Sequence, residues 1–232
     1  MNKKIVTVTF VTLVLIAAVY AAPVLARDRQ KRDEAKSPEK IMTHIATFNT
    51  GHNGWKYFSI PFDAVVSLEN DLRIEYNGQV YNFNEACGNI IDPNLFVFDN
   101  MDHRYKPTSV LESGKAYLIY LYVPDMVSLS AMGSFSDSED PVDLYQGWNF
   151  FGMSRNRPVV VADLHIIHDG TDYTWSEAID PTNGPIVDPS LFVFDNTARR
   201  WKYVSMNDEI LPGLTYCIYN YCDSVEIVFN SV

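Results

Sequence analysis

A ten-residue segment of this chain occurs twice. Residues 91–100 read Ile-Asp-Pro-Asn-Leu-Phe-Val-Phe-Asp-Asn, and residues 187–196 read Val-Asp-Pro-Ser-Leu-Phe-Val-Phe-Asp-Asn, at an offset of 187 − 91 = 96. Such a long fixed spacing indicates that one structural unit is duplicated. In each copy, Leu-Phe-Val-Phe is a short apolar run between turn-forming residues, which is typical of a buried strand. The sequence therefore predicts two equivalent β-rich units.

Other matches follow in the same order along both copies. Residues 54–59 correspond to 147–152, residues 81–86 to 173–178, and residues 114–117 to 213–216. The offsets are 147 − 54 = 93, 173 − 81 = 92 and 213 − 114 = 99. Since surface loops tolerate small insertions, we expect the residues gained by the second copy to lie in loops.

The patterns between these matches favour strands joined by tight turns. Asn77-Gly78 is a strong hairpin signal, and Asn84–Cys87 is the place in the first copy where a helical turn is expected. Each copy has about 95 residues, enough to bury a core of its own. The predicted fold is mainly β, with two tandem β-barrel-like or sandwich repeats, each with one short helical turn, after an N-terminal apolar leader.

The N-terminal residues have the pattern of an export signal. A basic start with Lys3 and Lys4 precedes an apolar run, and small residues stand before Arg27. An uncleaved membrane anchor is the alternative, because residues 5–26 carry no charge. Either way, we expect the rest of the chain to be extracellular or at the cell surface. The predicted divisions are a leader at 1–26, a charged linker at 27–40, a first repeat at 41–133, a linker at 134–141 and a second repeat at 142–232.

The charge of the chain limits its partners. It has 18 Lys and Arg against 29 Asp and Glu, a net charge of −11. Because such a chain repels phosphate backbones, nucleic acid is not an expected partner. Surface glycans and cell-envelope proteins are the expected partners, and contact with a membrane is expected only through an uncleaved leader.

The repeated signatures are similar to those of a known module. Gly147-Trp148-Asn149, Glu177-Ala178 and Pro212-Gly213 followed by Tyr216 resemble a β-rich repeat with Gly-Trp-Asn, Glu-Ala and Pro-Gly-x-x-Tyr signatures. That repeat occurs in tandem in secreted archaeal and some bacterial surface proteins. The first copy departs from it at Lys56 and Ser113. The resemblance implies a surface or extracellular module without an assigned activity, and it supplies no catalytic residues.

The duplication also helps to interpret the cysteines. Each stands where the other copy has an apolar residue: Cys87 opposite Ile179, Cys217 opposite Leu118, and Cys222 opposite Val123. Free cysteine behaves as a small hydrophobe, so buried thiols are expected. A disulfide between Cys217 and Cys222 is the alternative in an exported chain, although two residues 222 − 217 = 5 positions apart on one strand point to opposite faces.

The sequence predicts neither a metal site nor a cofactor. His165 and His168 lack further ligands at a suitable spacing. Asp92, Asp99, Asp102, Asp188 and Asp195 lie in turn sequences, where Asp side chains bind their own backbone, so we expect turns there and not calcium sites.

The chain also lacks the motifs of common enzymes, such as a nucleophile elbow or a P-loop. Glu85 and Glu177 match between the copies, but one acid per repeat is not a catalytic pair, and we expect both to cap the short helix. The sequence thus predicts a non-enzymatic module with a structural or adhesive role. A carbohydrate-binding module is the alternative, with Trp201, Arg199 and Arg200 as the exposed candidate site, whereas Phe194 is expected in the core.

Overall fold

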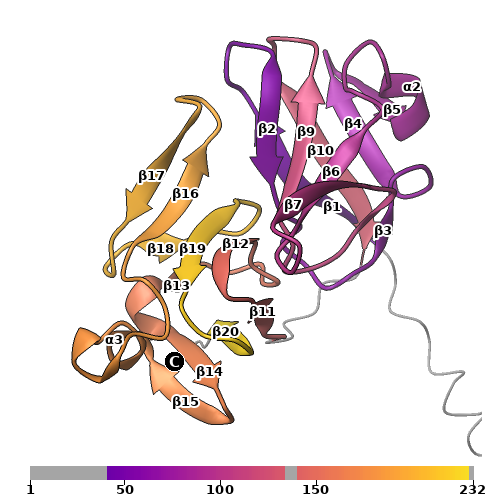
Figure 1. Ribbon diagram of the computed structural model, residues 1–232. Helices are drawn as coiled ribbons and strands as arrows, with labels where there is room; N and C mark the ends of the chain where they lie inside the picture. Colours follow the sequence, from indigo (N-terminus) through magenta and orange to yellow (C-terminus); the bar gives the residue numbers. More distant parts are fainter. Residues whose placement is uncertain (1–40, 134–139, 230–232) are drawn as a thin grey trace, which may run out of the picture. The chain divides into compact units, whose positions relative to one another are not determined.

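The computed structural model describes residues 41–133 and 140–229 of the chain, which belong to one compact unit, Lys40–Val232 (Figure 1). The predicted leader at 1–26, the charged linker at 27–40 and most of the linker at 134–141 lie outside the described residues. Below, the first repeat means the described residues 41–133 and the second repeat means 140–229.

The mainly β fold predicted from the sequence is confirmed. The first repeat contains β1 (Ile41–Phe48), β2 (Gly54–Phe58), β3 (Val66–Ser67), β4 (Leu72–Tyr76), β5 (Gln79–Asn82), α2 (Phe83–Ala86), β6 (Leu95–Asp99), β7 (Arg104–Thr108), β8 (Val110–Leu111), β9 (Tyr117–Leu121) and β10 (Val127–Gly133). The second repeat contains β11 (Val142–Leu144), β12 (Gly147–Phe151), β13 (Val159–Val160), η1 (Val161–Asp163), β14 (Leu164–His168), β15 (Thr171–Thr174), α3 (Trp175–Ala178), η2 (Pro181–Asn183), β16 (Leu191–Asp195), β17 (Arg200–Val204), β18 (Glu209–Ile210), β19 (Tyr216–Asn220) and β20 (Val225–Phe229).

Both repeats have the same sheet topology. The first has two four-stranded antiparallel sheets, in the orders β1-β10-β4-β5 and β2-β9-β6-β7, and the short pair β3-β8. The second has the equivalent sheets β11-β20-β14-β15 and β12-β19-β16-β17, and the pair β13-β18. Among the described strands, no sheet takes members from both repeats.

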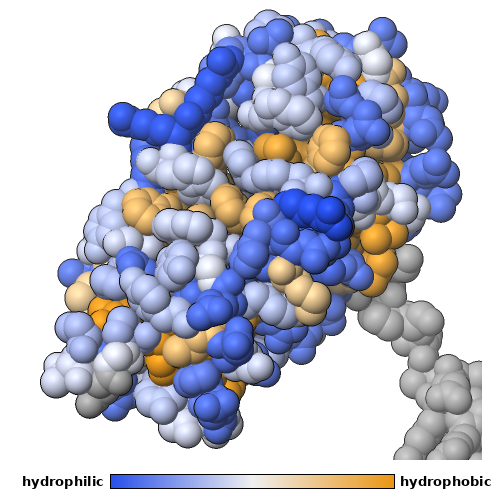
Figure 2. All heavy atoms as spheres, in the orientation of Figure 1, coloured by the Kyte–Doolittle hydropathy of each residue, from blue (hydrophilic) through white to orange (hydrophobic). Residues whose placement is uncertain are grey.

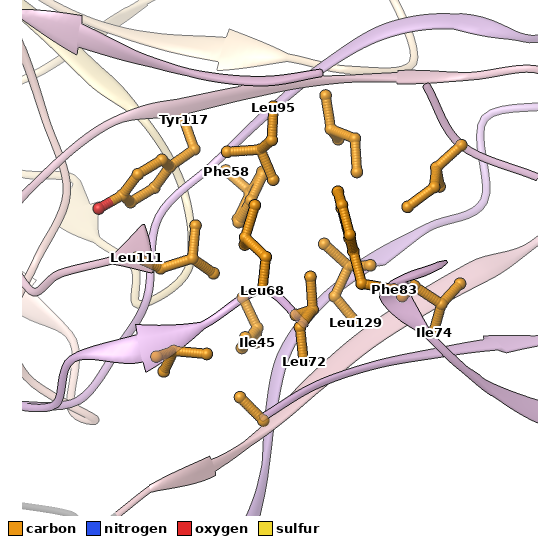
Figure 3. Packing of buried hydrophobic residues seen from close by; sticks show 14 of the residues in the cluster. Ile45, Phe58, Leu68, Leu72, Ile74, Phe83, Leu95, Leu111, Tyr117 and Leu129 are labelled. Carbon is orange, nitrogen blue, oxygen red and sulfur yellow. The ribbon is translucent and has the colours of Figure 1, made fainter. Parts of the chain in front are cut away.

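Each repeat has its own hydrophobic core. Figure 3 shows the first, in which Phe58, Leu95 and Tyr117 meet side chains from the opposite sheet such as Leu72 and Leu129. The duplicated strands β6 and β16 each place their leucine at 0% exposure, while their phenylalanines are only partly buried. The expectation that Phe194 is a core residue is therefore wrong. Because side chains alternate along a strand, Phe194 lies on the other face of its sheet from Leu191.

Local sequence signals account for the turns and the short helices. Asn77 and Gly78 both have positive φ, 52° and 74°, between β4 and β5, as the predicted hairpin requires. In α2, the Glu85 N–H donates to the Asn82 side chain, and the Asn82 N–H donates to the Glu85 carboxylate, both at 2.9 Å. Thr174 and Glu177 make the same capping box at α3, so the predicted helix-capping role of both glutamates is confirmed.

The Gly-x-x-Tyr signature also has a structural explanation. Gly114 and Gly213 turn the chain with φ of 75° and 79°, a conformation that favours glycine. The hydroxyl of Tyr117 then accepts a hydrogen bond from the Glu112 N–H at 2.5 Å. In the same way, the hydroxyl of Tyr216 accepts a hydrogen bond from the Leu211 N–H at 2.6 Å. Each tyrosine thus anchors the loop before its own strand.

Candidate functional site

Two asparagines join the repeats through reciprocal hydrogen bonds. The Asn100 amide accepts from the Phe150 N–H at 2.8 Å and donates to the Phe150 carbonyl at 3.2 Å. The Asn196 amide makes the same pair with Tyr57, both bonds at 2.8 Å. Asn100 and Asn196 are equivalent residues of the duplicated segment. Since each amide pairs with the edge strand of the other repeat, the contact has approximate two-fold symmetry.

Aromatic side chains fill the space around these bonds. The ring centroids of Phe98 and Phe150 are 4.2 Å apart, and those of the equivalent pair, Phe194 and Tyr57, are 4.3 Å apart. Tyr57 and Phe150 stack at 6.5 Å with an angle of 14° between their planes. We call the two asparagine pairs and this aromatic cluster the joint. The cluster consists of Tyr57, Phe98, Tyr105, Phe150, Phe194 and Trp201.

A buried lysine lies close to the joint. Lys56 is 0% exposed, and its Nζ donates to Thr50 Oγ1 at 2.7 Å and to the His52 carbonyl at 3.1 Å. Burial, together with the nearby Arg199 guanidinium, lowers the pKa of Lys56 to about 8. In the second repeat the equivalent Asn149 is also 0% exposed and binds the preceding loop. The lysine therefore serves the same structural purpose as Asn149.

Exposed and partly buried aromatic residues follow the same face of both sheets, beyond the joint. Row 1 consists of Trp55, Phe96, Tyr120 and Tyr122, and row 2 consists of Trp148, Phe192, Tyr219 and Tyr221. Trp55 is 45% exposed and pairs across strands with Tyr120 at 5.2 Å. Trp148 is 46% exposed and pairs with Tyr219 at 5.4 Å. The space-filling view shows separate hydrophobic patches on a largely hydrophilic face (Figure 2).

A carboxylate ends each row. The Tyr122 hydroxyl donates to Asp92 Oδ2 at 2.7 Å, and the Tyr221 hydroxyl donates to Asp188 Oδ2 at 2.7 Å. The hydrogen bonds from Tyr122 and from the Asn94 N–H lower the pKa of Asp92. The bond to Asp92 in turn raises the pKa of Tyr122, so the phenol stays neutral beside an ionised acid. Each row therefore combines apolar ring surface with a fixed hydrogen-bond acceptor.

A pocket of about 660 Å³ lies at one end of row 2, and Trp148, Phe192 and Tyr219 of that row line it. Aromatic side chains of the second repeat, including Trp148, Phe192 and Trp201, form its walls, and Cys217 on the central strand β19 forms its base. Phe98 and His103 of the first repeat close one side. Almost all of the lining side chains are apolar or aromatic.

The structure places the side chains of the three residues predicted to bind carbohydrate in different surroundings. Trp201 is partly buried in the joint, 5.4 Å from Tyr57 between ring centroids, and also lines the pocket. Arg199 is exposed, but its guanidinium donates to the carbonyl of Asn53 in the first repeat at 2.8 Å. Arg200 is exposed at the start of β17, opposite Asp195. The three side chains thus have different surroundings, and a common role for them in sugar binding remains a prediction.

All three cysteines are free, so the disulfide alternative for Cys217 and Cys222 is wrong. Cys217 is buried, as expected, whereas Cys87 and Cys222 are partly buried against the two cores. Burial raises the pKa of Cys217 to about 12, so its thiol is not a nucleophile near neutral pH.

The histidines and acids form no cluster suited to a metal ion within residues 41–133 and 140–229. His165 lies on β14 and pairs with Asp172 at 2.7 Å. The turn acids bind backbone groups: Asp92, for example, accepts from the Asn94 N–H at 2.8 Å, and Asp195 accepts from the Thr197 N–H at 2.8 Å. The predicted turn role is confirmed for Asp92, Asp99, Asp188 and Asp195. The Asp102 carboxylate pairs with Arg104 and Lys106 instead.

Sequence reasoning missed the two rows. Two signals were present in the sequence. Trp55 and Trp148 hold equivalent positions, and each copy has a Tyr-x-Tyr pattern, Tyr120 with Tyr122 and Tyr219 with Tyr221. Alternating aromatics on strands suit a core equally well, however. Only the packing of the sheets decides which face is buried.

Comparison with known proteins finds no similar family model, curated protein or solved structure. The resemblance to the Gly-Trp-Asn repeat therefore stays a prediction. In the parts of the chain that the structure describes, no helix has the length and apolar character needed to cross a membrane.

Proposed function

We propose that this chain is a non-catalytic module of the cell exterior that acts by binding, and that its two aromatic rows bind carbohydrate. The single observation that carries the proposal is that both repeats leave the same tryptophan exposed, at 45% and 46%, on the same face. Large aromatic side chains left in contact with water, in neighbouring positions, mark interaction sites. A purely structural repeat would bury this surface.

The chemistry of each row suits a sugar. The C–H faces of pyranose rings pack against aromatic rings, while sugar hydroxyls need hydrogen-bond partners at the edge of the same surface. Trp55 and Tyr120 supply the rings of row 1, and the Asp92 carboxylate supplies an acceptor beside Tyr122. The lowered pKa of Asp92 keeps this acceptor charged further into the acidic range than an ordinary aspartate.

Two rows in one compact unit suit a polymer better than a free sugar. Shallow stacking surfaces bind weakly, but two linked sites raise the overall affinity for a ligand that reaches both. Such binding would serve adhesion to surface glycans, the role expected from the apolar leader and the duplication.

The test is binding of the purified chain to a glycan array, followed by titration of the best polysaccharide. We expect Trp55→Ala and Trp148→Ala each to weaken binding, and the double variant to abolish it. Met126→Ala, which removes an exposed apolar side chain (53%) outside the rows, is the matched control and should bind normally.

Two results would contradict the carbohydrate-binding part of the proposal. The first is the absence of any glycan bound at high protein concentration, and the second is unchanged binding by the double tryptophan variant. A hydrolytic activity in a substrate panel would contradict the non-catalytic part of the proposal.

A further inference from the structure

The base of the pocket beside row 2 is a small, buried, uncharged side chain. Cys217 is 6% exposed and lies in register between Phe150 on β12 and Phe192 on β16. Its thiol stays protonated because burial raises its pKa to about 12. The side chain is therefore neither a nucleophile nor part of a disulfide, and its effect on the pocket is one of size.

The first repeat provides an internal comparison for this position. There the equivalent residue is Leu118, in register with Phe96 and Tyr57. Leucine is bulkier than cysteine and would raise the base of the pocket. The walls differ as well: Tyr57 and Tyr105 bind each other through their hydroxyls at 2.7 Å, where the second repeat has Phe150 and Trp201.

The rim of the pocket also differs between the repeats. His103 packs against Gly147, where a Cβ atom would lie only 3.0 Å from the imidazole Cε1, and its Nδ1 lies 3.2 Å from the Trp148 carbonyl. The equivalent of His103 is Arg199, whose longer side chain reaches the Asn53 carbonyl of the first repeat. His103, the shorter of the two side chains, lines the pocket.

We propose that this pocket binds an uncharged planar aromatic group of a small molecule. Its volume of about 660 Å³ lies in the usual range for small-molecule sites. The walls are flat rings, which favour stacked or edge-to-face contacts with another ring. No aspartate, glutamate, lysine or arginine is among the lining residues, so the pocket offers no such charge to pair with an ionised ligand. A sugar suits the other end of row 2, where the Asp188 carboxylate accepts from Tyr221. It does not suit the pocket, where its hydroxyls would lose water without a carboxylate to accept from them.

The test uses 2-naphthol as the probe and intrinsic tryptophan fluorescence as the readout, since Trp148 and Trp201 line the pocket. We expect saturable binding at one site by the native chain. Cys217→Leu introduces the leucine that the first repeat has at the equivalent position 118. His103→Arg introduces the arginine that stands at the equivalent position 199. Each should weaken binding by about tenfold or more, because the added atoms occupy the ligand's space.

The matched control is Leu118→Cys, which should bind 2-naphthol like the native chain. Thermal unfolding of each variant shows whether the fold is kept. If Cys217→Leu does not fold, the binding of 2-naphthol by His103→Arg alone tests the proposal. Non-saturable binding, or full affinity in a folded Cys217→Leu or His103→Arg variant, would overturn the proposal. Since these variants leave row 1 intact, continued glycan binding by them separates this test from the test of the rows.

Discussion

At the scale of single residues, the repeats show how different side chains solve one structural problem. Asn149 and Lys56 are both fully buried beneath a loop and bind its polar groups. The Asn149 amide is neutral. The Lys56 ammonium, in contrast, must lose its hydration and lies near the Arg199 guanidinium. The cost of this charge depends on pH.

The lysine gives a prediction about stability and pH. The pKa of Lys56 is about 8 in the folded chain, below its ordinary value of 10.5. The unfolded chain therefore binds more protons between these values, and stability rises with pH as the folded-state penalty is relieved. We expect the free energy of unfolding of the native chain, relative to Lys56→Asn, to increase by roughly 1–3 kcal/mol from about pH 8 to about pH 10.5. Urea denaturation at both values measures it, and equal pH profiles for the two proteins would show that the lysine is not charged and buried.

At the scale of elements, each duplicated strand has two different faces. Leu191 of β16 is 0% exposed in the core, while Phe194 contacts Tyr57 and Trp201 in the joint. The same segment therefore stabilises one repeat and attaches it to the other. Its repetition in the sequence reflects both requirements.

The two faces should respond differently to truncation. We expect Leu191→Ala to cost about 2–5 kcal/mol, since it leaves a cavity in a closed core. Phe194→Ala should cost less, about 1–3 kcal/mol, because the ring is partly exposed. Denaturant titration of both variants measures this order, and a larger loss for Phe194→Ala would contradict the assignment of faces.

Local signals in the sequence were enough to predict some elements. The hairpin at Asn77-Gly78 and the capping glutamates Glu85 and Glu177 depend on neighbouring residues alone. The position of the Phe194 and Trp201 side chains in the joint was not predictable in this way. Their environment is set by the other repeat, and no local pattern records that an Asn100 amide will bind the backbone of Phe150.

At the scale of the whole molecule, the joint determines what the surface offers. The aromatic face of each sheet is divided, with one part in the joint and the other exposed as row 1 or row 2. Since the contacts are reciprocal, the two repeats bury the same part and expose the same part. The joint therefore leaves the same candidate binding surface exposed in both repeats.

The two asparagine amides of the joint each make two hydrogen bonds to the other repeat. Backbone bonds between the repeats add to them, such as that from the Ser59 N–H to the Gly213 carbonyl at 3.0 Å. Differential scanning calorimetry of the native chain and of the double variant Asn100→Ala, Asn196→Ala tests the joint most directly. We expect one cooperative transition for the native chain. Each substitution should cost about 1–3 kcal/mol, because a backbone pair loses its partner, and the double variant should unfold in two steps as the repeats separate. A double variant that unfolds in one step at the native temperature would contradict the account.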